Sequence, residues 1–128
     1  MPIEEKARKI IEGKNFGFLA TIKRDGSPQI TPVWVDHDGE HVLVNTTKNR
    51  AKTANAKRDP RVALAIVEHE NPYSKVVIYG RVVEITENGA NEHIDKLAKK
   101  YLGKEKYPWS SHKEKRVIMK IKPEKIVY

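Results

Sequence analysis

The sequence predicts a mainly β protein in which an antiparallel sheet closes into a barrel and short α-helices flank it. Short segments rich in Val and Ile recur along the chain, and Asp-Gly or Asn-Gly turns typical of β-hairpins follow several of them. The connections between these segments are short. Strands and helices do not alternate in the regular order that indicates a parallel sheet. Together these observations favour a barrel over a doubly wound fold.

The first third of the chain is predicted to form one helix and then three strands. Pro2 suits the first helical position, and apolar residues of segment 2–14 share one helix face: Ile3, Ala7, Ile10 and Ile11. Segments 16–23, 29–35 and 41–46 are predicted strands separated by Asp-Gly turns. One side of the first strand carries Phe16, Phe18, Ala20 and Ile22.

The remainder is predicted to contain more strands and two helices. The predicted elements are a short helix that carries Arg50 and Lys52, strands 61–67, 75–87 and 116–122, a helix between Asn91 and Leu102, and a terminal strand at 125–128. Gly80 inside a long apolar strand indicates a bulge or a close backbone approach. Pro123 is expected to break the strand that precedes it.

Composition limits the class of protein. The chain has 128 residues, which fits a single domain over 1–128, and no cysteine, so it has neither disulfides nor thiolate metal ligands. No apolar run approaches the roughly 20 residues that cross a bilayer. No signal peptide is visible, and a cytoplasmic location is expected. The formal net charge of +8 favours an anionic partner, such as nucleic acid or a phosphorylated small molecule.

The segment 44–67 is predicted to bind a phosphate. A strand ends in Thr46 and Thr47, a basic turn follows, and a short helix begins near Arg50 and Lys52. Free N–H groups and the dipole at a helix start attract an anion, and the two basic side chains would neutralise it. Both can reach one anion only if Arg50 lies in the turn and Lys52 in the first helical turn. The alternative is a solvated basic turn.

A second candidate site is the strand that contains Thr31, Pro32, Val33 and Trp34. Pro32 cannot donate a hydrogen bond to a neighbouring strand, so it indicates a sheet edge, a bulge or a place where something else lies alongside. A planar ligand could lie there against free backbone groups. The alternative is an ordinary edge strand with a core tryptophan.

No catalytic or metal-binding constellation stands out. His37 and His41 flank an Asp-Gly turn, and the other histidines are scattered, so no metal site is predicted. No catalytic residue is predicted either, and chemistry is expected to belong to a bound cofactor. Basic residues of the last third interleave with Tyr101, Tyr107 and Trp109, as in some binders of single-stranded nucleic acid. Acidic residues interrupt this pattern, so a solvated face is favoured.

Three blocks of the chain resemble the pyridoxamine 5′-phosphate oxidase-like superfamily of flavin-binding split barrels. They read GFLATIKRDGSPQITPVWV, NTTKNRAKTANAKRDPRVALAIV and YGRVVEI, and the most specific element is R-x-K followed by N-x-x-x-DPRV. The C-terminal YPWSSHKEKRVIMKIKPEKIVY resembles the branch of F420-dependent (deazaflavin) oxidoreductases. The resemblance implies a six-stranded antiparallel split barrel of Greek-key type, paired as a homodimer with cofactors at the subunit interface.

The resemblance also implies roles for residues. Arg50 and Lys52 match the phosphate-binding positions, with Thr46 and Thr47 nearby, and segment 31–34 matches the strand that faces the flavin or deazaflavin ring. FMN and F420 share the phosphate end, so these residues do not separate the two cofactors. The Arg-x-x-Pro type of C-terminal segment that grips vitamin B6 substrates is not visible in KPEKIVY.

The leading functional hypothesis is therefore a flavin- or F420-dependent oxidoreductase that acts on a small molecule. A non-enzymatic FMN carrier or sensor is the first alternative, because a fold does not determine a function. A nucleic-acid binder is the second.

Overall fold

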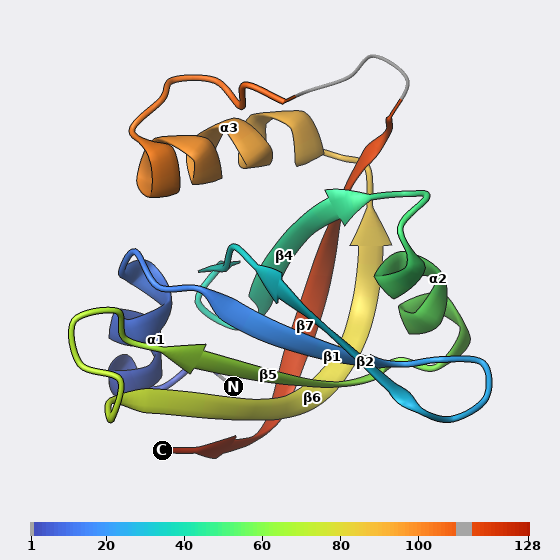
Figure 1. Ribbon diagram of the computed structural model, residues 1–128, viewed down its shortest axis with the longest axis horizontal. Coiled ribbons are helices and arrows are strands. Elements are labelled where there is room, and N and C mark those ends of the chain that lie inside the picture. The colour runs from blue at the N-terminus through green and yellow to red at the C-terminus, as the bar shows by residue number, and fades with distance from the viewer. Residues whose placement is uncertain (1, 110–113) are drawn as a thin grey trace.

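Over residues 2–109 and 114–128, which the computed structural model describes, the chain forms three helices and one antiparallel sheet of seven strands (Figure 1). The strands are β1 (Gly17–Ile22), β2 (Pro28–Val33), β3 (Asp36–His37), β4 (Val42–Thr47), β5 (Arg61–Val67), β6 (Lys75–Thr86) and β7 (Arg116–Val127). The helices are α1 (Glu5–Glu12), α2 (Ala51–Arg58) and α3 (Ala90–Leu102). The strand order is β2-β1-β5-β6-β7-β4-β3, and the sheet curls into a half-barrel whose edges are β2 and β3.

The predicted fold class is confirmed, but six strands is the wrong number. The described residues form seven strands because Asp36 and His37 add a short strand, β3, in front of the Asp38-Gly39 hairpin. The hairpin turn places Gly39 at φ +96°, which only glycine adopts readily. The strand predicted to stop before Pro123 continues through it as β7.

Gly80 explains why Pro123 is tolerated inside a strand. The β6–β7 register shifts between Tyr79 and Gly80, and Gly80 lies opposite Pro123. A ladder irregularity is the place where a residue without an N–H is accepted in a sheet. A Cβ on Gly80 would lie 2.2 Å from the Lys122 carbonyl oxygen. The predicted bulge and close backbone approach are therefore both confirmed.

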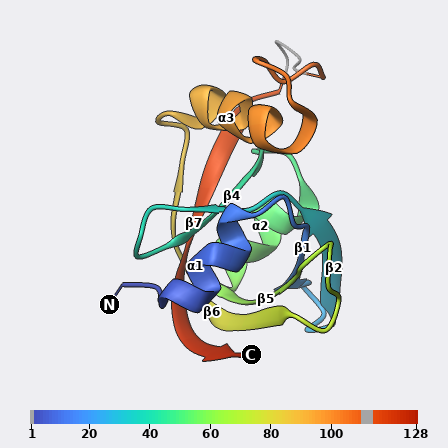
Figure 2. The ribbon, with the colours of Figure 1, turned by 90° about the vertical axis from the view of Figure 1, so that its left-hand side faces the viewer.

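Two helices cover opposite ends of the half-barrel (Figures 1 and 2). At one end, the predicted apolar face of α1 and its preceding residue enter the main core: Ile3, Ala7, Ile10 and Ile11. At the other end, Ala56 of α2 joins the same core. Because each helix has only 8 residues, it depends on this packing for its stability.

The outward side of the sheet is apolar over the middle of β2, β1, β5 and β6. Phe16, which directly precedes β1, and Phe18 within β1 are 52% and 40% exposed. Leu19 points to the other side of β1 and is buried in the core. Ile30 of β2 and Tyr79 of β6 are also exposed. The paired apolar residues form two rows across β2, β1, β5 and β6: Ile30, Ala20, Ala63 and Tyr79, and Pro32, Phe18, Ala65 and Val77.

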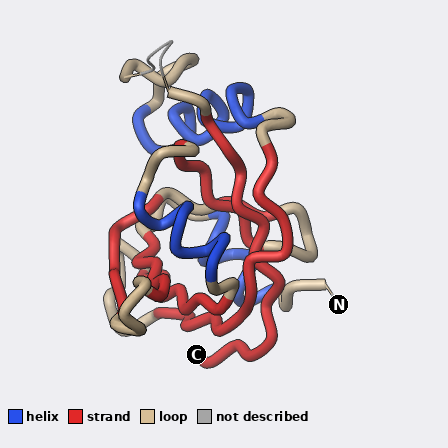
Figure 3. The backbone as a smooth tube through the Cα atoms, turned by 90° about the vertical axis from the view of Figure 1, so that its right-hand side faces the viewer, coloured by secondary structure: helices blue, strands red, loops and turns tan. Residues whose placement is uncertain are grey.

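The third helix lies outside the half-barrel, beside β4 and β7 (Figure 3). It has its own cluster of Ile94, Leu97 and Tyr101, against which Trp34 and Tyr107 pack. Lys100 ties the helix to the barrel by donating to the carbonyl oxygens of Ile11 and Val35 at 2.6 and 2.9 Å. None of the described helices is long and apolar enough to cross a membrane. His112, one of the scattered histidines for which no metal site is predicted, lies outside the described residues.

Candidate functional site

A cavity of about 300 Å³ lies between the end of β2, the end of β4, the start of α2 and the inner side of α3. This volume is at the lower end of the range of small-molecule sites, about 300–1,000 Å³. It is lined by Phe16, Pro32, Val33, Trp34, Asn45, Thr46, Thr47, Arg50, Lys52, Ile94, Tyr107 and Arg116. The strands β2 and β4 are not hydrogen-bonded to each other, so the cavity lies at the opening of the sheet.

The structure brings most of the predicted site residues together in this cavity. Its wall includes Pro32, Val33, Trp34, Thr46, Thr47, Arg50 and Lys52. The edge position inferred from Pro32 is confirmed, because β2 pairs only with β1. Thr31 does not line the cavity. Its Oγ1 is buried and has no hydrogen-bond partner among the described residues.

The start of α2 is fixed to the end of β4. Arg50 is the residue before the first helical residue, and its N–H donates to the carbonyl oxygen of Thr47 at 3.2 Å. The fully buried Thr53 donates from its Oγ1 to the same oxygen at 2.7 Å. Lys52 is therefore in the first helical turn and Arg50 in the turn before it, which is the arrangement that convergence on one anion requires.

The body of α2 is fixed by Asn55, the asparagine of the N-x-x-x-DPRV element. Its Nδ2 donates to Thr21 Oγ1 at 3.1 Å and to Gln29 Oε1 at 2.9 Å, which joins the helix to β1 and β2. Its Oδ1 accepts a hydrogen bond from Arg58 at 2.8 Å. Asn55 is buried, and these partners satisfy both ends of its amide. It positions the helix and does not contact the cavity.

Three cations meet at the cavity: Arg50, Lys52 and Arg116. None of the lining residues that the structure describes is acidic. Within the described part of the chain, none of the three cations forms an ion pair. Burial, and then the positive charges of Arg50 and Arg116, lower the pKa of Lys52 below its usual value. An anion bound among them would relieve this repulsion, so the donor set fits a phosphate.

Aromatic side chains form another part of the wall, which includes Phe16, Trp34 and Tyr107. Trp34 stacks on Tyr101 with ring centroids 5.1 Å apart and meets Tyr107 edge-on at 5.9 Å. Phe16 also stacks on Tyr101, with ring centroids 5.7 Å apart. The Tyr101 hydroxyl donates to the Asn15 carbonyl oxygen at 2.6 Å and accepts from the Val35 N–H, which fixes the stack. The cavity is thus lined by both cationic and aromatic side chains.

Five residues that line the cavity were not predicted from the sequence to belong to the site: Phe16, Asn45, Ile94, Tyr107 and Arg116. Arg116 reaches the cavity because it is paired with Thr47 across β4 and β7, a register between segments far apart in the sequence. Its guanidinium lies over the Tyr107 ring, 4.6 Å from the centroid. The sequence shows an aromatic segment followed by basic residues, which could have suggested a contact such as that of Arg116 with Tyr107. It does not indicate that these two residues line the same cavity as Arg50 and Lys52.

An antiparallel half-barrel with a cation-lined cavity at its opening defines the class of pyridoxamine 5′-phosphate oxidase-like split barrels. The family model described as pyridoxamine 5′-phosphate oxidase matches residues 3–128, and the chain belongs to this family. The resemblance noted in the sequence is thereby confirmed.

Solved structures agree with this assignment. A structure described as F420 reductase is 29% identical to this chain, with a TM-score of 0.86 and 98% of each chain covered. A conserved hypothetical protein from Mycobacterium tuberculosis is 24% identical, with a TM-score of 0.72, covering 98% of this chain and 83% of that one. General Stress Protein 26 from Bacillus anthracis is 22% identical, with a TM-score of 0.70, covering 97% and 91%. The last two show the shared fold alone.

Proposed function

We propose that this protein is a flavin- or deazaflavin-dependent oxidoreductase that acts on a small molecule. The observation that carries the proposal is the cavity that Arg50, Lys52 and Arg116 line together with aromatic side chains, with no acidic residue among the described lining residues. A flavin or deazaflavin cofactor carries an anionic phosphate, which the cations could bind, and a planar ring, which the aromatic side chains could contact. Family membership supports the same reading.

Each part of the wall has a role in this proposal. Arg50 and Lys52, with the hydroxyls of Thr46 and Thr47, would hold the phosphate. The segment Pro32–Trp34 would lie along the ring, and the aromatic side chains would exclude water from it. The cofactor, when bound, supplies hydride transfer, and the protein supplies binding and orientation.

The cofactor is proposed to be F420 or FMN. Both carry a phosphate that this cavity could hold, so the cationic side chains do not distinguish them. The F420 reductase that is 29% identical to this chain supports testing F420 first. The net charge of +8 is compatible with the longer anionic tail of F420. A cytoplasmic location remains a prediction.

The protein is further proposed to act as a homodimer. The two apolar rows on the outward side of β2, β1, β5 and β6 form a contiguous apolar patch in which Phe18, Ile30 and Tyr79 are exposed, and exposed apolar patches mark association surfaces. Pro32 belongs both to a row and to the cavity wall, so a second copy seated there would border the cavity. Sedimentation of the wild type and of Ile30→Glu tests this: a dimer that the substitution splits is expected, and a wild-type monomer would contradict it.

A binding titration followed by a turnover assay tests the proposed function. FMN and F420 are titrated separately into the apo-protein, and the bound cofactor is then reduced and offered to a panel of small electron acceptors. Binding with turnover of at least one acceptor is expected. Binding without any turnover would favour the carrier or sensor alternative. Binding of neither cofactor would contradict the proposal.

A further inference from the structure

Asn45 connects the cation-lined cavity to α3 by hydrogen bonds. Its Oδ1 accepts from Arg116 at 3.0 Å. Its Nδ2 donates to the Ala90 carbonyl oxygen at 2.8 Å and lies 3.2 Å from Nδ1 of His93. Asn45 and Arg116 both line the cavity, whereas His93 lies behind them and is only 8% exposed.

These partners determine the orientation of the Asn45 amide. A carbonyl oxygen such as that of Ala90 can only accept, so it requires the NH₂ group on its side. The Arg116 guanidinium can only donate, so it requires the amide oxygen on the other side. The nitrogen of Asn45 that faces His93 is therefore a donor. Nδ1 of His93 must be the acceptor and carries no proton.

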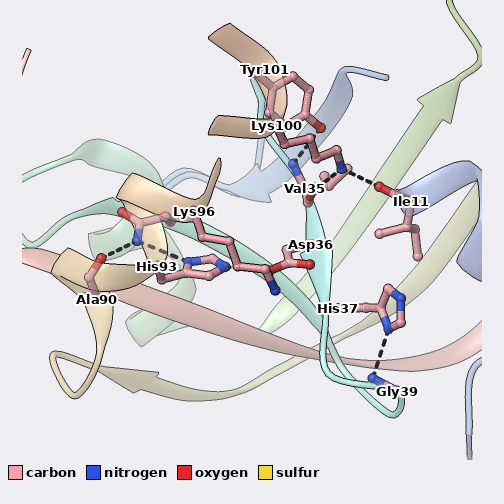
Figure 4. A network of polar contacts seen from close by, with 11 residues as sticks. Ile11, Val35, Asp36, His37, Gly39, Ala90, His93, Lys96, Lys100 and Tyr101 are labelled. Carbon is pink, nitrogen blue, oxygen red and sulfur yellow. Dashed lines mark hydrogen bonds and ion pairs between the residues drawn. The ribbon is translucent and has the colours of Figure 1, made fainter. Parts of the chain in front are cut away.

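The other nitrogen of His93 has a matching partner. Its Nε2 lies 3.1 Å from Asp36 Oδ2, which also accepts from Lys96 at 3.2 Å (Figure 4). Burial alone would raise the pKa of Asp36, but hydrogen bonds from His93, the His37 N–H and Lys96 hold it well below its usual value. Asp36 is thus a carboxylate, and the proton of His93 is on Nε2.

We propose that Asn45 and His93 are positioning residues of the cofactor site, which hold the Arg116 guanidinium toward the bound anion. The inference rests on the proposed function. His93 in its neutral, Nε2-protonated form keeps the amide oxygen of Asn45 facing Arg116. The same guanidinium also lies over the Tyr107 ring, 4.6 Å from the ring centroid. Helix α3, although outside the barrel, therefore determines the position of a cation in the cavity.

Two substitutions of His93 separate this role from simple packing. The amide oxygen of His93→Asn can occupy the place of Nδ1 and accept from Asn45, but it does not reach Asp36. The amide nitrogen of His93→Gln can occupy the place of Nε2 and donate to Asp36, but it leaves Asn45 without its acceptor. A packing role would make His93→Gln the milder change, because glutamine is larger and favours helices more than asparagine. The positioning role predicts the opposite order for anion affinity.

The first measurement is the tautomer of His93 in the wild-type apo-protein, from the ¹⁵N chemical shifts of its ring in neutral buffer. A neutral ring protonated at Nε2 is expected. A ring protonated at Nδ1, or at both nitrogens, would overturn the inference, because either form places two donors against each other at Asn45. This measurement does not depend on the identity of the cofactor.

The second measurement compares FMN and F420 affinities of the wild type, His93→Asn, His93→Gln and Lys52→Met, with thermal unfolding as a check on the fold. His93→Gln should bind about five- to tenfold more weakly than His93→Asn, the loss expected for one hydrogen bond that orients a charged group. Equal affinities, or the reverse order, would overturn the inference. If Lys52→Met weakens binding while the two His93 variants do not differ, only the positioning role fails. If neither cofactor binds the wild type, the proposed function fails, and the positioning role fails with it.

Discussion

The role of Lys52 can be tested by replacing it with methionine. Methionine keeps the apolar stem of a half-buried side chain and removes only the charge. A charge-assisted hydrogen bond contributes about 1.5–3 kcal/mol, and 1.4 kcal/mol corresponds to tenfold in affinity. Lys52→Met should therefore weaken FMN or F420 binding by about tenfold to somewhat more than hundredfold.

The structure indicates where in this range the effect should fall. Lys52 is partly buried beside Arg50 and Arg116, and both raise the positive potential at its amine. Removing it relieves repulsion in the free protein while two cations remain to hold the phosphate. The lower half of the range, about ten- to thirtyfold, is therefore expected.

Fluorescence titration measures the change, and two controls isolate its cause. Riboflavin has the ring of FMN without its phosphate, so its affinity should be the same for the wild type and Lys52→Met; the deazaflavin without its phosphate-bearing tail serves the same purpose for F420. Lys57→Met removes an exposed charge from the last turn of the same helix and should leave every affinity unchanged. Unchanged FMN and F420 binding in Lys52→Met, or an equal loss for riboflavin, would refute the assignment of Lys52 to the phosphate.

Other predictions concern the stability of the fold, measured as the free energy of unfolding in urea. Asn55→Leu should lower it by about 1–3 kcal/mol, because the buried Thr21 on β1 and the half-buried Gln29 on β2 lose their hydrogen-bond partner; an unchanged value would show that α2 does not depend on this contact. Gly80→Ala should lower it by about 1–3 kcal/mol or more, since the new Cβ meets the Lys122 carbonyl oxygen; a neutral effect would contradict the close approach of β6 and β7. Asp36 has a pKa lower in the folded protein than in the unfolded chain, so its contribution is present above the unfolded value of about 3.9 and is lost as the pH falls below it. The stability difference between wild type and Asp36→Asn should therefore shrink on acidification below about pH 4, and a difference that does not change with pH would contradict this.

Local patterns were sufficient to predict most of the fold. The spacing of apolar residues in α1 predicted the face that enters the core. Gly80 predicted the register irregularity between β6 and β7. Pro123 misled the prediction because its effect on a strand depends on what lies opposite it. Here the partner is Gly80, where the register shifts and the missing N–H is tolerated. Strand β3 was missed because two residues are too few to show a period.

The site residues that are close together in the sequence could be predicted. Those that meet only through pairing between distant segments could not. Arg50 and Lys52 are close in sequence, and the helix that presents them could be recognised from its neighbours. Arg116 comes to the same cavity only through the β4–β7 register, and Asn45 gains its role only when α3 is in place. Neither contact leaves a periodic pattern in the sequence.

A crystal structure of the protein with F420 or FMN bound would show whether the cavity is the cofactor site. We expect the cofactor phosphate within hydrogen-bond distance of Arg50 and Lys52, the ring along Pro32–Trp34, and Arg116 turned toward an anionic group while it remains bonded to Asn45. A phosphate bound elsewhere, with the three cations facing solvent, would contradict the proposed site and the function derived from it.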